Sequence, residues 1–259
     1  PVTEPGNYYA TLGNNGLAGI SMVYKPSFKS GFDFGNTSSF ERFLFYNDSL
    51  SHYWVGRPFT QLKFVMGSKK EQNLSIDASS NVSKWFNVGL TFRYTTSPGA
   101  YPNQESDDKN FAFKTRFQTK NYRYIVLANY IHNKLQLEEN GGIEYDSVFE
   151  QKIETDPKLI YVNLTSSENK WKENSFHFSH YFSLTKPADT AAENRKTAKV
   201  FQPGSLSHAF TITKTILTYT DDKIDTLFYP AVYLDSASTQ DALQNSSMEN
   251  TLAWSNSRN

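Results

Sequence analysis

The chain has 259 residues, in which 26 Lys plus Arg are balanced by 26 Asp plus Glu, and it contains no cysteine. The zero net charge argues against a nucleic-acid-binding protein, and the lack of cysteine excludes thiolate metal sites, a cysteine nucleophile and disulfides. No run of about 18 apolar residues occurs, so the printed sequence holds no transmembrane helix.

Aromatic residues dominate the apolar composition. They make up 15% of the chain, with 20 Phe and 16 Tyr, while all hydrophobic residues together reach 38%. Soluble domains usually reach about 45–50%. Aromatic and β-branched residues favour strands, and the abundant Ser, Thr and Asn suit water-facing strand positions and turns. The composition therefore predicts an all-β protein.

Residues 1–57 form the least regular part of the sequence. Gly13, Gly16 and Gly19 superficially resemble a phosphate-binding loop, but no strand–loop–helix context surrounds them. They are better interpreted as turns or points of close backbone approach. We therefore divide the chain into an irregular segment, 1–57, that leads into the strands of residues 58–259.

The clearest strand runs from Phe86 to Thr95, where apolar and polar residues alternate strictly over ten positions. That is about the length with which a tilted strand crosses a bilayer. We predict about ten strands after Pro58. The others centre on Phe111–Phe117, Phe176–Leu184 and Phe210–Ile216, with weaker candidates at Phe59–Met66, Gln72–Ser80, Lys158–Thr165, Thr226–Tyr233 and Thr251–Ser255.

Short and long connections alternate between these strands. The short ones are Asn81–Lys84, Thr119–Tyr122, Ser166–Lys172 and Asp221–Asp225, and the long ones are Ser97–Lys109, Asn133–Pro157, Lys186–Gly204 and Asp235–Glu249. This rhythm is typical of an antiparallel up-and-down barrel with tight periplasmic turns at one end and long external loops at the other. The sequence therefore predicts part of a transmembrane β-barrel, of about ten or more strands.

The alternation assigns side chains to the two faces of such a barrel. The residues predicted to face lipid are Phe86, Val88, Leu90, Phe92, Phe111, Phe113 and Phe117, and those predicted to face the lumen are Arg93, Lys114 and Arg116. A two-residue turn at Lys120–Asn121 would place Phe117 opposite Tyr124 and Lys114 opposite Leu127. Aliphatic residues such as Leu127 do not suit a purely polar lumen, and they leave room for an internal plug. Trp85, Tyr122, Trp171 and Tyr219 flank the short turns, as a membrane-interface girdle would.

Three stretches resemble a known family. Gly56–Leu74, Trp85–Gln104 and Thr119–Ile143 are similar to the putative porin family of the Bacteroidota. The resemblance is clearest from Asn7 to Ile143 and continues more weakly to the end. It implies a bacterial outer-membrane barrel that allows passive diffusion, with no catalytic residues. Family members are longer, and the chain stops at Ser257-Arg258-Asn259, which reads like the start of a turn, so we expect a fragment.

No motif predicts a catalytic, cofactor or metal site. His177 and His180 are three residues apart on a strand and should point to opposite faces. The acidic cluster Glu105, Asp107 and Asp108 lacks the spacing of a calcium loop. Glu138 and Glu139 are adjacent in a predicted loop, which is a poor geometry for an acid–base pair. We expect no enzyme and no cofactor.

A different pattern, Asp followed by Ser or Thr and a small or aliphatic residue, resembles the O-glycosylation acceptor of exported Bacteroidota proteins. The candidate acceptors are Ser49, Ser147, Thr190, Thr226 and Ser236.

The leading functional hypothesis is an outer-membrane porin that passes small solutes or ions and contacts outer-membrane lipid, with no role for nucleic acid. One alternative is a structural or assembly barrel that conducts nothing and holds a plug or a partner protein; an oligomer also stays open. A soluble glycan-binding sandwich is the third hypothesis, and the long–short rhythm argues against it.

Overall fold

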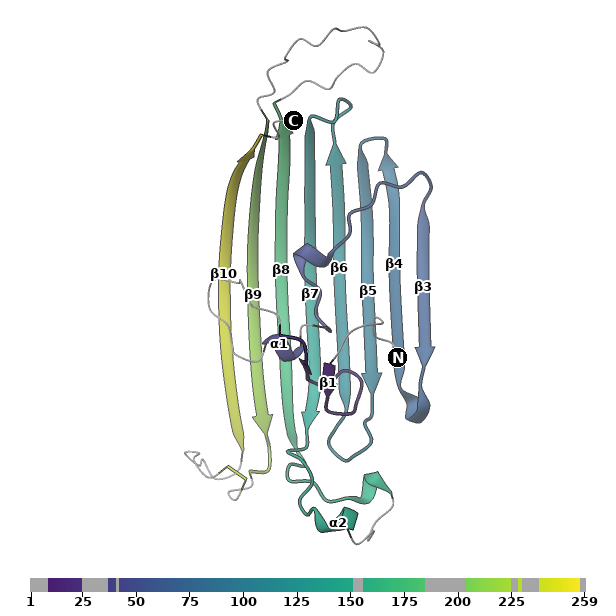
Figure 1. Ribbon diagram of the computed structural model, residues 1–259, viewed down its shortest axis with the longest axis vertical. Helices are drawn as coiled ribbons and strands as arrows, with labels where there is room; N and C mark the ends of the chain where they lie inside the picture. The colour runs from purple at the N-terminus through teal and green to yellow at the C-terminus, as the bar shows by residue number, and fades with distance from the viewer. Residues whose placement is uncertain are drawn as a thin grey trace.

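The computed structural model describes residues 9–24, 37–40, 42–150, 156–184, 204–224, 228–229 and 238–256. Its main feature is an eight-stranded antiparallel sheet in which each strand pairs with the next along the chain (Figure 1). The strands are β3 (Phe59–Met66), β4 (Gln72–Ser83), β5 (Phe86–Ser97), β6 (Ser106–Gln118), β7 (Tyr124–Glu139), β8 (Ser167–Ser183), β9 (Ser205–Asp221) and β10 (Thr239–Ser255). The predicted all-β meander is confirmed. In the described residues β3 and β10 are the edges of an open sheet, which matches part of an up-and-down barrel.

The remaining elements are short. A small hairpin of β1 (Tyr9–Thr11) and β2 (Gly19–Ser21) precedes α1 (Thr37–Phe40) and the 3₁₀ turn η1 (Asn47–Ser49). Further along the chain, the connections hold η2 (Ser68–Lys70), α2 (Ser147–Glu150) and η3 (Pro157–Leu159). None of the helices that the structure describes is long and apolar enough to cross a membrane.

Several predicted elements in the second half of the chain are wrong. Lys158–Thr165 is not a strand: it holds η3 and one isolated bridge, between Val162 and Ile143. Ser166–Lys172 is not a short turn but lies almost wholly in β8, and most of the predicted loop Asp235–Glu249 belongs to β10. The last two stretches are mostly polar on both faces, so they lack the apolar alternation that identifies a strand. The predicted strand Thr226–Tyr233 falls mostly outside the described residues, and Phe228 and Tyr229 are not in a strand.

The long–short rhythm holds only for the first part of the sheet. The tight connections after β4 and β6 lie at one end, and the links 98–105 and 140–166 lie at the other (Figure 1). Contrary to the prediction, β8 then ends and β9 begins at the tight-turn end, and residues 221–224 lie at the opposite one. The predicted turn at Ser166–Lys172 added a strand reversal that the structure does not contain. As a result, every later connection was assigned to the wrong end of the sheet.

The predicted register of the β6–β7 hairpin was wrong by two residues. Phe117 lies opposite Val126, and Lys114 lies opposite Asn129. The turn contains four residues rather than two: the backbone N–H of Thr119 donates to the Tyr124 carbonyl, and Tyr122 adopts a positive φ of 53°. Because the shift is an even number, every side chain keeps its predicted face.

Candidate lumen face and its covering segment

The two faces of the sheet differ sharply in chemistry. One, here named the apolar face, carries rings and aliphatic side chains in adjacent rows across the strands. Its members include Phe86, Val88, Leu90 and Phe92 of β5, Phe111, Phe113 and Phe117 of β6, Val126 and Tyr130 of β7, Phe176, Phe178 and Phe182 of β8, Leu206, Phe210 and Ile212 of β9, and Met248, Leu252 and Trp254 of β10. All seven residues predicted to face lipid thus share this face.

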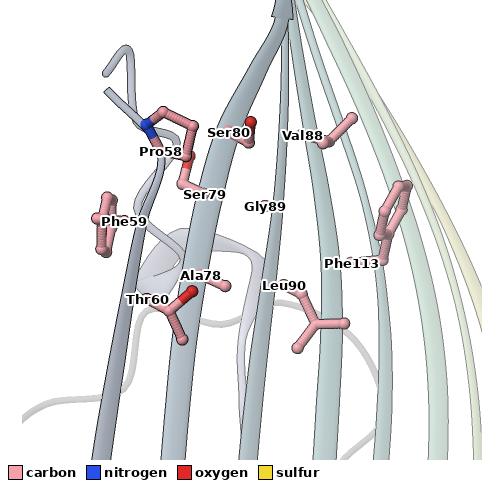
Figure 2. Close-up of a pocket in the computed structure, with 10 residues that line it drawn as sticks. All are labelled: Pro58, Phe59, Thr60, Ala78, Ser79, Ser80, Val88, Gly89, Leu90 and Phe113. Carbon is pink, nitrogen blue, oxygen red and sulfur yellow. The ribbon is translucent and has the colours of Figure 1, made fainter. Parts of the chain in front are cut away.

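Side chains on the apolar face are open to the surroundings. Phe113 and Ile212 are each 42% exposed, and none of the described segments packs over them. Figure 2 shows Phe113, Val88 and Leu90 around a shallow hollow beside the small side chain of Ala78. Soluble monomers rarely expose apolar surface of this extent.

The opposite face is covered by the N-terminal part of the chain. We name residues 9–24, 37–40 and 42–57 the covering segment; Figure 1 shows α1 and β1 lying across the sheet. Beneath it, on the covered face, lie Arg93, Lys114 and Arg116, the three residues predicted to face a lumen.

Each of these three cations has an aromatic ring of the covering segment above it. Arg93 lies 4.9 Å from the ring centroid of Phe45, Lys114 lies 5.1 Å from that of Tyr53, and Arg116 lies 5.9 Å from that of Trp54, so their charges interact with the ring faces. Lys114 is only 3% exposed, and its ammonium also forms an ion pair with Asp77 at 3.1 Å. The covering segment therefore shields charges that would otherwise face water.

Asparagine side chains attach the covering segment to the sheet. The buried amide of Asn133 accepts from the backbone N–H of Phe45 at 3.0 Å and donates to its carbonyl at 2.9 Å, as a neighbouring strand would. Asn110 donates to the Phe43 carbonyl at 2.8 Å, and Asn47 donates to Ser175 Oγ at 3.0 Å. The bonds of Asn133 and Asn110 satisfy backbone groups of a segment that is not itself in the sheet.

Apolar contacts support the same attachment. Leu17, Phe40, Phe43 and Leu44 pack on Leu135, Leu137 and Trp171, and Phe45 packs on Ala112 and Ile131. Trp171 is therefore buried under the covering segment, and its predicted place in an interface girdle was wrong. Fully burying one such side chain stabilises a fold by about 1.5–3 kcal/mol.

Gly16 permits the closest approach of the covering segment to β6. Its φ is +94°, and a Cβ added there would lie 2.5 Å from Ser106 Oγ and 3.1 Å from Asp108 Oδ2. Next to it, Ser106 Oγ donates to the Asn15 carbonyl, and Asn14 donates to the Gln104 carbonyl at 2.7 Å. The interpretation of this glycine as a point of close approach is confirmed.

The remaining candidates do not form a common site. His177 and His180 lie on opposite faces of β8, where His177 contacts Thr211 and His180 contacts Tyr124 and His208. Asp108 is buried on the covered face, whereas Asp107 pairs with Lys109 on the other face. Within the part of the chain that the structure describes, no group of three or more potential ligands could hold a metal ion.

The glycosylation candidates stay predictions. Ser49 lies in η1 with an exposed side chain, and Ser147 begins α2. Thr190, Thr226 and Ser236 lie outside the described residues.

Sequence reasoning missed the aromatic cover. Phe40, Phe43, Phe45, Tyr53 and Trp54 stand in a stretch without period-two alternation, so no strand was predicted there. The available signal was their density within a segment otherwise interpreted as irregular.

The first prediction concerns attachment of the covering segment. Asn133→Ala removes both hydrogen bonds to Phe45 and leaves its backbone groups unpaired, which should weaken docking by roughly 2–4 kcal/mol. Hydrogen–deuterium exchange of residues 42–57 should then quicken, while strand amides stay protected. The matched control is Asn245→Ala, on the edge strand β10, because its side chain is on the same face of the sheet as that of Asn133. Equal exchange in both variants would contradict this account.

The second prediction concerns pH. Burial, and next the positive charge of Lys114, lower the pKa of His52 from its ordinary value of 6.5. The docked segment thus favours neutral His52, so docking should be complete above about pH 6.5 and weaken as the pH falls below it. Exchange of residues 42–57, corrected for its intrinsic pH dependence, should rise from pH 7 to pH 5. His52→Gln should remove that rise; an unchanged rise in this variant would show that another group is responsible.

Comparisons with known proteins identify the family. A family model described as "Putative porin" matches residues 1–259, the whole of the chain. Neither a curated protein nor a solved structure matches the chain. Because the match spans the apolar face, the covered face and the covering segment alike, the chain belongs to this porin family.

Proposed function

We propose that this chain forms part of an outer-membrane β-barrel that lets small solutes diffuse across the membrane and has no catalytic role. The observation that carries the proposal is the uncovered apolar face, which extends over adjacent strands of a sheet whose other face carries buried amides and cations beside the apolar residues under the covering segment. Family membership supports a porin-like role in the outer membrane. Under this proposal the apolar face contacts lipid, and Arg93, Lys114 and Arg116 lie on the lumen side.

The height of the apolar face suits a bilayer. On β5 alone, five positions of this face, two residues apart, carry the apolar side chains of Phe86, Val88, Leu90, Phe92 and Tyr94. At about 3.4 Å per residue they extend about 27 Å along the strands, comparable with the apolar band of about 25 Å in outer-membrane barrels.

The edges of the sheet support a larger barrel. The backbone groups of β3 and β10 that point away from the sheet have no strand partner among the described residues. Unpaired strand edges do not occur in the hydrocarbon region, because each unsatisfied group costs several kcal/mol there. We therefore propose that further strands of a longer chain close the barrel.

A second candidate function is favoured by the covering segment. It lies on the side assigned to the lumen, caps three cations with aromatic rings, and is attached by buried asparagines. A barrel filled in this way could be a structural one that conducts nothing. The covering segment does not bury the whole of this face, however, because polar side chains of β9 and β10 such as Thr211 and Ser247 are not buried.

Conductance distinguishes the two candidates. In planar bilayers the complete protein should conduct, and the double variant Gly16→Val with Asn133→Ala should conduct more, because loosening the covering segment widens the lumen. Asn245→Ala serves as the control, and heat-modified mobility on gels verifies folding. If only the double variant conducts, the covering segment is a plug and the structural role takes the lead. If neither conducts while both fold, solute diffusion is wrong.

If the apolar face contacts lipid, the cost of placing a charge on it should depend on the depth of the residue in the bilayer. Ile212 and Thr220 lie on the same face of β9, with Ile212 among the apolar rows and Thr220 beyond them, opposite Glu168. Ile212→Arg should lower the free energy of unfolding in bilayers by about 2–4 kcal/mol and Thr220→Arg by about 0–1 kcal/mol. Urea titration in lipid vesicles measures both. Equal losses would indicate that this face does not contact hydrocarbon.

A further inference from the structure

Four lysines mark the end of the apolar rows. Lys109 of β6, Lys134 of β7 and Lys172 of β8 are directly opposite one another in the strand register. Lys214 of β9 lies opposite Asn174, two residues nearer the apolar rows. We name these residues the lysine belt. They are on the apolar face, on the side where the rows meet the long links 98–105 and 140–166.

The belt carries more positive charge than its neighbours neutralise. Lys109 pairs with Asp107 at 2.9 Å. Lys134, Lys172 and Lys214 form no ion pair with another described residue, and Lys109, Lys172 and Lys214 are exposed. Like charges directly opposite on neighbouring strands destabilise a sheet. One row further on, Lys170 is already paired with Glu168, so the unneutralised charge is confined to the border of the apolar rows.

The composition of the border indicates the partner. A ligand here would meet rings and aliphatic groups on one side, at Phe111, Tyr130 and Ile212, and ammonium groups on the other. An acyl chain with an anionic headgroup offers both chemistries in that order. Lysine binds phosphate through charge-assisted hydrogen bonds, and each basic residue near an anionic membrane surface adds to the attraction.

We propose that the lysine belt binds the phosphate groups of lipid headgroups in the leaflet on the side of the links 98–105 and 140–166. With the tight turns after β4 and β6 on the periplasmic side, this is the outer leaflet. The inference rests on the proposed membrane function. The lipid acyl chains lie along the apolar rows, and their phosphates neutralise Lys134, Lys172 and Lys214. The site therefore selects phosphorylated lipid over neutral lipid.

Binding of bisphosphorylated lipid A to the complete protein in neutral detergent micelles, followed by native mass spectrometry, tests the proposal. The triple variant Lys134→Gln, Lys172→Gln and Lys214→Gln should bind it at least about tenfold more weakly. The matched control, Lys63→Gln, Lys84→Gln and Lys120→Gln, removes the same charge from exposed sites elsewhere and should bind like the wild type. Dephosphorylated lipid A should bind the wild type as weakly as the triple variant binds the phosphorylated form.

Three results would overturn the proposal: unchanged binding by the belt variant, equal loss in both triple variants, or equal binding of the dephosphorylated lipid. Displacement of the lipid by inorganic phosphate at equal concentration would assign the site to a soluble anion and would also overturn it. Conductance of the folded belt variant is measured as well, because it tests solute diffusion independently of lipid binding. A conducting protein with unchanged lipid binding refutes the belt alone, whereas selective lipid binding without conductance refutes only solute diffusion.

Discussion

Hydrogen bonding between long neighbouring strands is the constraint on which this structure depends, because it forces successive side chains onto opposite faces. Over eight strands, that alternation collects most of the rings and aliphatic groups on one face. The other face carries amides, hydroxyls and cations, together with the apolar residues that lie under the covering segment. A sheet with such faces needs two different environments. In the proposed barrel, lipid provides one, and the covering segment together with water provides the other.

The covering segment contacts both the charged and the aliphatic residues of the covered face. Cations such as Lys114 are costly to bury, yet aliphatic residues such as Leu135 on the same face are unfavourable in water. The segment supplies aromatic rings for the former and apolar side chains for the latter, while Asn133 and Asn110 bind its backbone. Its placement thus follows from the same alternation that leaves the apolar face open, and in the proposed barrel it determines how much of a lumen remains.

Local patterns predicted the fold well where one face was strongly apolar. β5 and β6 alternate rings with polar residues, so their existence and their faces followed from the sequence. The prediction of a turn at Ser166–Lys172 was wrong because that part of β8 carries charged residues on the face where aromatic residues would indicate a strand. The candidate site was predicted only in part. Arg93, Lys114 and Arg116 were placed on the correct strands, but their cover depends on contacts between residues 88 positions apart, such as Phe45 with Asn133, which no local pattern encodes.

The central claim is that the apolar face of β5 contacts lipid while its other face is shielded, and the absence of cysteine makes it directly measurable. Single cysteines introduced from Phe86 to Thr95 in the complete protein can carry spin labels after reconstitution into vesicles. Collision with dissolved oxygen should peak at positions 86, 88, 90 and 92 and fall at 87, 89, 91 and 93, a period of two in phase with the rings. High access to a water-soluble nickel complex at Leu90, or an absence of any alternation, would contradict the account.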